Sequence, residues 1–280
     1  MKMISAGSLG VVLFLLLLAT TALCLLTGNT RRSYPTLARS DKVIVAGKTV
    51  ALEQLAASYQ PQLVQRAGEE SPPALTMWWE AIDAGDAIAL VYHPVWQDER
   101  HPTPLLHWLY YAYRAIVYGL PVRDIEYIQI NISRADGLIQ RVRYEGSTAT
   151  AYNQPIAEHV RITIDRSDAA YKETATLPNN ETRVRPVQLA GPRLSFGITT
   201  WSHQFVLLED GAGSYAVPVP MPLAYLTEEN YAKHKLARRS QGDFATREGV
   251  VGRTAKSVIR TVMLGVPYLL SQLRYANTPH

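Results

Sequence analysis

The sequence predicts a mainly β (α+β) fold that follows a single N-terminal transmembrane helix. An uncharged apolar run near the N-terminus predicts the membrane-spanning segment. Beyond it, short segments of alternating apolar and polar residues are separated by Gly, Pro and Asp-Gly turns. Strands that recur about every ten residues are typical of a β-sandwich, so we expect a sandwich-like domain with helices at its periphery.

The apolar run covers residues 10–26 and holds no charged side chain. A helix of this length crosses a hydrocarbon core of about 30 Å, and the backbone of such a segment has to be helical in lipid. Lys2 precedes the run and Arg31 follows it. We therefore expect an uncleaved signal anchor over residues 1–30. A cleaved signal peptide and a lipidated Cys24 are the alternatives.

The short N-terminal tail favours an extracytoplasmic domain, because long domains translocate largely regardless of their charge. We expect a single-pass protein of the bacterial inner (cytoplasmic) membrane with a periplasmic domain, whereas cleavage would give a secreted protein. Cys24 is the only cysteine, so the domain has no disulfide. The net charge of +4 suits an anionic membrane surface, and the scattered basic residues argue against nucleic acid as a partner.

The composition divides the chain behind the anchor into a linker, a domain and a helical region. The linker is polar and covers residues 31–40, the β-rich domain covers 41–226, and the C-terminal helical region covers 227–280. The apolar stripe of this region lies within 250–275, where Arg260 and Pro267 interrupt it, so we expect it to pack on the domain rather than to cross the membrane again.

The expected elements of the first half follow in chain order: a hairpin over 42–50 that turns at Ala46-Gly47, a helix over 51–58, a short strand over 62–64, a polar loop over 68–73, a short helix over 77–84, a strand over 87–92, a loop over 95–104 and a helix over 105–118. The last helix is apolar almost all round, which predicts that it is buried, and Gly119 and Pro121 end it.

The second half predicts mostly strands: 124–133, its return over 138–144 after a turn at Asp136-Gly137, 158–165, 183–189, 194–200, 204–208 and 214–217. Thr227 then caps a helix that runs to residue 240, with Glu228 and Glu229 in its first turn.

Two carboxylates, Asp124 and Glu126, begin the first of these strands. Residues i and i+2 of a strand point to the same side, so the two carboxylates share a face and repel each other. A proton or a cation relieves that repulsion. Carboxylates with one or two imidazoles suit a divalent cation such as Mg²⁺, Ca²⁺, Mn²⁺ or Zn²⁺, and His101 and His203 are the candidate imidazoles.

An alternative without a metal fits the same residues. In it, basic neighbours compensate the carboxylates: Arg123 or Arg114 for Asp124, and Arg141 or Arg143 for Glu126. The sequence has no Gly-x-Ser-x-Gly elbow, no phosphate-binding Gly-rich loop, no Cys-x-x-Cys and no His-Glu-x-x-His. The dipeptide Ser202-His203 therefore lacks the usual sequence context of a nucleophile and its base.

A longer pattern resembles a known superfamily. A strand ends in His-Pro at residues 92–94, Asp98-Glu99 and an aromatic segment over 108–113 follow, and Asp-x-Glu begins the alternating strand at 124–130. This order is similar to the necrosis-inducing-protein superfamily and to the related vacuolar-sorting-type domains, whose lead-in resembles residues 55–63. The resemblance implies a β-sandwich.

In the toxin branch of that superfamily, an Asp-Trp-Glu segment preceded by His helps to bind a divalent cation and to engage membrane sphingolipid. The resemblance carries this role to Asp124 and Glu126 only. Val122, Arg123 and Ile125 stand in the stretch where the toxin motif has its two histidines and its tryptophan.

Three functions are therefore open. The first is a non-catalytic, membrane-anchored envelope protein whose β-rich domain binds a lipid, a glycan or a protein. The second is a metal-dependent hydrolase centred on Asp124 and Glu126. The third is a membrane-perturbing relative of the toxins.

Overall fold

The computed structural model describes residues 32, 34–149, 151–154, 159–168, 170–177, 179–189, 191–209 and 215–236, together with Leu15 and Ala19. Apart from those two residues, the anchor expected over 1–30 lies outside the described residues, as does the part of the expected C-terminal helical region that follows residue 236. No helix within the described part of the chain has the length and the apolar character needed to cross a bilayer.

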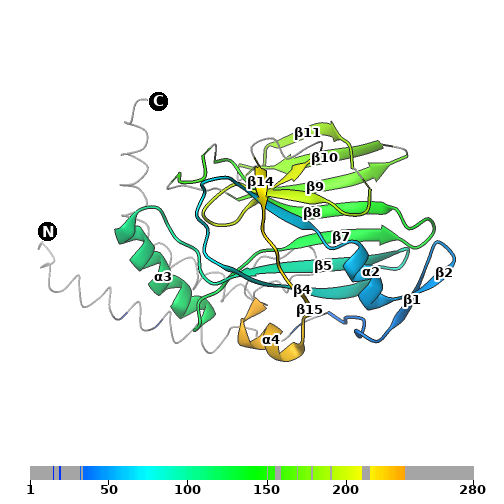
Figure 1. Ribbon diagram of the computed structural model, residues 1–280, viewed down its shortest axis with the longest axis horizontal. Coiled ribbons are helices and arrows are strands. Elements are labelled where there is room, and N and C mark those ends of the chain that lie inside the picture. Colours follow the sequence, from blue (N-terminus) through cyan, green and yellow to red (C-terminus); the bar gives the residue numbers. More distant parts are fainter. Residues whose placement is uncertain are drawn as a thin grey trace, which may run out of the picture.

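A large, mostly antiparallel sheet forms the body of the domain (Figure 1). Its strands lie in the order β11 (Thr182–Val187), β10 (Ala170–Thr176), β9 (His159–Ser167), β8 (Ile139–Ser147), β7 (Ile128–Ser133), β5 (Ala87–Trp96), β4 (Ala74–Asp83) and β15 (Leu223–Tyr225). The short strand β6 (Asp124–Ile125) pairs with the end of β5, and β15 runs parallel to β4.

A smaller sheet lies across the large one and shares its core. It consists of β13 (Phe205–Leu208), β12 (Ser195–Ile198), β3 (Gln62–Arg66) and β14 (Tyr215–Pro218). Tyr144 of the large sheet packs edge-on against Phe196 with a ring distance of 5.1 Å, and its hydroxyl accepts a hydrogen bond from the Leu207 N–H. The expected mainly β fold is confirmed, and apolar burial between the two sheets stabilises it.

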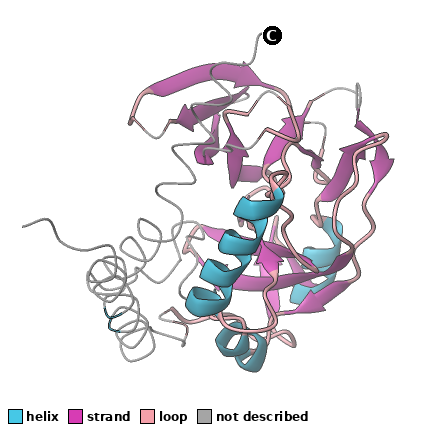
Figure 2. Cartoon of the chain, turned by 90° about the vertical axis from the view of Figure 1, so that its left-hand side faces the viewer, coloured by secondary structure: helices cyan, strands magenta, loops and turns pink. Residues whose placement is uncertain are grey.

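The remaining elements lie around the sheets (Figures 1 and 2). They are the ribbon of β1 (Lys42–Val45) and β2 (Lys48–Ala51), and the helices α2 (Leu52–Ser58), α3 (Pro104–Tyr118) and α4 (Glu228–Lys233). Ala46 and Gly47 both have positive φ in the β1–β2 turn, as a tight hairpin requires. Helix α3 has the expected length, but it is not buried all round, because the side chain of Trp108 is 67 % exposed.

The segment expected as a helix over 77–84 is instead part of β4. Every residue from Met77 to Ile82 is buried, because both faces of the strand are covered. Trp79 belongs to the core between the sheets, whereas Trp78 packs on the other side with Leu226 and Tyr231 next to and within α4. A strand covered on both faces loses its alternation of apolar and polar residues, so its pattern cannot be told from that of a buried helix.

The strand expected over 124–133 is divided in two. Strand β6 ends at Ile125, the Glu126 N–H donates to the Pro94 carbonyl, and β7 begins at Ile128. Strands β10 and β15 were not expected. Strand β10 is largely polar with little alternation, and β15 has only three residues.

The segment expected as a linker is fixed to β4 by a buried cluster around Glu80. The Glu80 carboxylate contacts Arg32 Nε at 3.0 Å, Tyr34 Oη at 2.9 Å and His93 Nε2 at 2.9 Å. Burial alone would raise the pKa of Glu80, but His93, Arg32 and Tyr34 together lower it below its ordinary value. Arg32 also stacks on the ring of Tyr231 in α4 at 4.7 Å. The position at which the chain enters the domain is therefore fixed.

Candidate functional site

Three segments that are distant in the sequence meet at the end of β5. Ser71 lies in the loop between β3 and β4, Asp124 begins β6, and His203 lies in the loop between β12 and β13. Asp124 is the register partner of Trp96, the last residue of β5, and the Trp96 ring stacks on His203 with a distance of 4.1 Å and an angle of 9°. Trp96 thus joins two of the three segments.

His203 has a partner on each ring nitrogen. Its Nδ1 lies 2.5 Å from Asp124 Oδ2, and its Nε2 lies 2.7 Å from Ser71 Oγ. The imidazole is fully buried. The backbone of His203 has a φ of 55°, a left-handed conformation that residues with a side chain rarely adopt. Such a conformation persists only where the surroundings enforce it, so the imidazole is held in one orientation.

The guanidinium of Arg114 in α3 supplies positive charge to the same place. Its nitrogens lie 3.1 Å from Glu99 Oε2, 3.4 Å from Asp98 Oδ1 and 3.5 Å from Asp124 Oδ1. Nη2 also donates to the Arg123 carbonyl at 2.8 Å. The alternative pairing of Asp124 with Arg114 is therefore observed.

Burial and neighbouring charges change the ionisation of Glu99. Burial raises its pKa to about 8, while the positive charge of Arg114 opposes this rise and the negative charge of Asp124 adds to it. Glu99 therefore holds its proton more strongly than an ordinary carboxyl does.

Of the four residues expected to hold a cation, the structure brings only two together. Asp124 and His203 are in contact, as described above. Glu126 lies outside β6, which ends one residue earlier. His101 packs edge-on against Trp201 at 4.6 Å, and its Nδ1 accepts the Thr103 N–H at 3.0 Å. Within the described ranges, no group of three or more His, Cys, Asp or Glu residues is arranged to hold a metal ion. The divalent cation stays a prediction.

Sequence reasoning missed Ser71 and gave Arg114 only as an alternative. Ser71 precedes two prolines in a polar loop, which indicates a turn and nothing about chemistry. The role of Arg114 could have been predicted, because it is the only charged residue in the apolar helix α3. A lone charge in such a helix has to find a partner, and acidic residues just before and just after the helix are the natural ones.

A separate open cavity of about 460 Å³ lies beside β3 and β14. Its walls carry four prolines, Pro61, Pro218, Pro220 and Pro222, together with Met77 and Arg193. Prolines have no backbone N–H, so the donors that this cavity offers come from the other lining residues, Arg193 among them. The volume is within the range of small-molecule sites.

The comparisons with known proteins give only distant structural similarity. No family model and no curated protein matches the chain. A solved structure described as "NLPPya in complex with glucosamine" is 12% identical, covers 75% of this chain and 88% of its own, and has a TM-score of 0.35.

A second structure, "NLPPya in complex with mannosamine", is 11% identical, covers 83% and 96% of the two chains, and also has a TM-score of 0.35. A third, "Toxin fold for microbial attack and plant defense", is 14% identical, covers 76% and 88%, and has the same TM-score. These are distant similarities to a toxin-type fold. The resemblance to vacuolar-sorting-type domains stays a prediction.

Proposed function

We propose that this chain is a membrane-tethered envelope protein whose β-rich domain binds lipid at the bilayer surface through an aromatic face of α3. The observation that carries the proposal is the exposure of that face. Trp108 is 67 % exposed and Tyr111 38 %, and Leu120 just beyond the helix is 71 % exposed. Trp108 and Tyr111 are three residues apart and so lie on the same side of the helix.

The chemistry of this face suits the boundary between lipid and water. Trp and Tyr combine an apolar ring with a polar group and are enriched at that boundary. Two exposed aromatic rings on one side of a helix favour a partner more than a single exposed apolar residue does. A bilayer surface is the partner that an adjacent membrane anchor would provide.

The length of chain between the expected anchor and the domain supports the same partner. Residue 26 ends the apolar run, and Arg32 is fixed against Glu80 and Tyr231. Six residues span at most about 20 Å, so a bilayer that holds the anchor lies within that distance of Arg32.

Helices α3 and α4 adjoin each other near that point. The Nζ of Lys235, just after α4, lies 3.1 Å from the position that a Cβ on Gly119 would take. Gly119 ends α3, and the Arg32 guanidinium stacks on the ring of Tyr231 in α4. The end of α3 therefore lies near α4 and Arg32. The net charge of +4 adds attraction to anionic lipid.

A vesicle-binding measurement tests the lipid-binding face without the anchor. A protein that begins at Thr30 keeps Arg32 and is mixed with vesicles of phosphatidylcholine and phosphatidylglycerol. The double substitution Trp108→Ser and Tyr111→Ser is expected to weaken sedimentation with the vesicles at least tenfold, because each ring loses apolar burial of about 1.5–3 kcal/mol.

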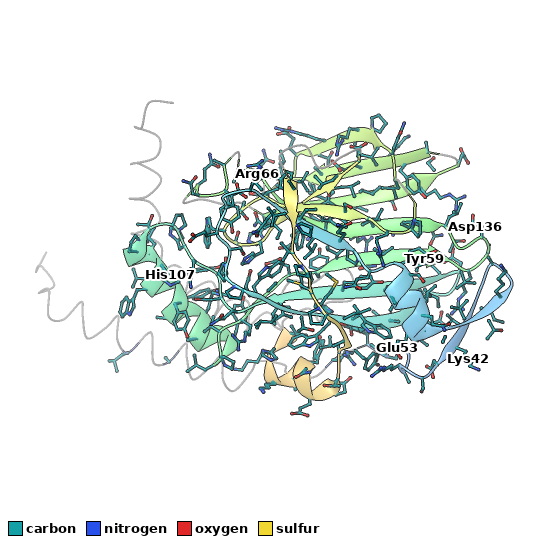
Figure 3. The ribbon with its side chains drawn as sticks, in the orientation of Figure 1. Lys42, Glu53, Tyr59, Arg66, His107 and Asp136 are labelled. Carbon is teal, nitrogen blue, oxygen red and sulfur yellow. The ribbon has the colours of Figure 1, made fainter. Side chains whose placement is uncertain are left out.

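The matched control is the double substitution Ile44→Ser and Leu138→Ser. Both side chains are exposed, and Leu138 follows the turn at Asp136, at the end of the molecule opposite His107 of α3 (Figure 3). This control should bind vesicles as the unchanged protein does. Equal binding by all three proteins would contradict the proposal. Binding only to glucosamine, mannosamine or a protein would favour the glycan or protein alternatives.

The second candidate function is the metal-dependent hydrolase, and the contact of Asp124 with His203 favours it. Arg114 weighs against it, because a guanidinium already faces Asp98, Glu99 and Asp124. Stoichiometric metal in the purified protein that disappears with Asp124→Ala would support the hydrolase.

A further inference from the structure

We propose that Ser71, His203 and Asp124 form a catalytic triad that hydrolyses carboxylic esters. The inference goes beyond lipid binding and does not depend on the membrane tether. Ser71 Oγ lies 2.7 Å from His203 Nε2, and His203 Nδ1 lies 2.5 Å from Asp124 Oδ2. A hydroxyl, an imidazole and a carboxylate joined in this order through opposite ring nitrogens are the arrangement of a serine nucleophile, its base and the group that orients the base.

Triads are recognised by geometry rather than by sequence context. These three residues come from three separate loops or strand ends, which explains why no local motif marks them. The absent Gly-x-Ser-x-Gly elbow is the signature of a single fold class, and its absence does not bear on a β-rich protein.

The surroundings hold the base in one orientation. Trp96 stacks on the imidazole, and the left-handed backbone of His203 is enforced by its loop. Arg114 contacts the carboxylate oxygen of Asp124 that does not face His203. Each carboxylate oxygen thus has its own partner, which fixes the plane of the carboxylate relative to the ring.

Tyr152 provides a donor next to the nucleophile. Its hydroxyl lies close enough to the Ser71 side chain for a hydrogen bond to it to lower the pKa of the phenol. Burial raises the pKa of Tyr152 to about 12, so the phenol keeps its proton at neutral pH. A protonated phenol beside the nucleophile can donate to the oxyanion that forms on the substrate and so stabilise it.

The reaction has two balanced steps. Ser71 Oγ attacks the acyl carbon, its proton passes to His203 Nε2, and the carbon–oxygen bond to the alkoxide breaks. The alkoxide takes the proton from His203 and leaves as the alcohol, so an acyl ester of Ser71 remains. Water then attacks this ester, gives a proton to His203, and releases the carboxylic acid as the proton returns to Ser71 Oγ.

The test uses the full chain in detergent micelles with p-nitrophenyl acetate as substrate and a fluorophosphonate as a covalent label. The label should attach to Ser71, located by peptide mass spectrometry, and Ser71→Ala should abolish labelling. Ester hydrolysis should fall at least 100-fold in Ser71→Ala and in His203→Gln. Ser58→Ala, which removes an exposed hydroxyl bonded to the Gln54 carbonyl, should leave both readouts unchanged.

Ser71→Ala removes only one oxygen, so the protein should still fold, with the circular dichroism spectrum of the unchanged chain and a modestly lower unfolding temperature, because His203 Nε2 loses a partner. Should His203→Gln fail to fold, Ser71→Ala alone decides. A folded, unlabelled protein beside a serine hydrolase that is labelled in the same mixture would overturn the proposal. Labelling at Ser202, or hydrolysis that survives Ser71→Ala, would overturn it as well.

Discussion

Replacing Arg114 with Met lowers the free energy of unfolding by about 3–5 kcal/mol, the cost of leaving one member of a buried ion pair without its partner. The Arg114 side chain is 2% exposed, and it is shared by Asp98, Glu99 and Asp124. Without it, the charges of the carboxylates face one another with little water to screen them. Urea-induced unfolding measures the change.

Two further variants separate this effect from lost packing. Arg114→Lys keeps the charge but loses the forked geometry of the guanidinium, so we expect a smaller loss. Arg141→Met removes a cation from the more exposed pair with Asp165 and should cost less than about 1 kcal/mol. A loss in Arg114→Met no larger than in Arg141→Met would contradict the account of the cluster.

Replacing Glu80 with Gln is expected to have a similarly large effect, about 3–5 kcal/mol, because Arg32 would lose its buried counter-charge. The Glu80 side chain is fully buried and contacts Arg32, Tyr34 and His93. For the same reason, a protein that begins at Ser33 should unfold at a lower temperature than one that begins at Thr30. Thermal unfolding followed by circular dichroism measures both changes.

The matched control for Glu80 is Glu53→Gln. Glu53 pairs with Arg39 where both side chains are more than half exposed, and such pairs contribute less than about 1 kcal/mol. Equal stability of the proteins that begin at Thr30 and at Ser33 would show that Arg32 does not fix the start of the domain.

Local signals were sufficient for much of the fold. The β1–β2 hairpin and the turn at Asp136-Gly137 were predicted because glycine and its neighbour form tight turns that few other pairs allow. The helix α3 followed from its long apolar run, and its end followed from Gly119 and Pro121. These features depend on a few adjacent residues, so the sequence alone shows them.

The rest depended on contacts between distant segments. The type of β4 was mispredicted because α4, far along the chain, covers its second face. The sequence offered several possible partners for Asp124 and could not single out His203. The position of His203 depends on the pairing of β12 with β13, which the sequence does not show. The role of Ser71 could not be predicted, because it depends on the contact of its hydroxyl with His203 Nε2.

The exposure of the aromatic face of α3 could not be predicted from its composition. A helix buried in the protein and a helix that faces lipid are both rich in apolar residues, so composition does not tell them apart. Only the exposure of Trp108 distinguishes the two cases. Of the five tryptophans, the other four are buried, so Trp108 is also a selective reporter.

Quenching of tryptophan fluorescence by brominated lipid tests the membrane-facing account most directly. The full chain is reconstituted in vesicles with bromine on the lipid acyl chains, and it is compared with Trp108→Phe. We predict that brominated lipid quenches the emission of the unchanged chain and that Trp108→Phe abolishes most of this quenching. Quenching of equal size in both proteins, or none in either while the protein remains in the vesicles, would contradict the account.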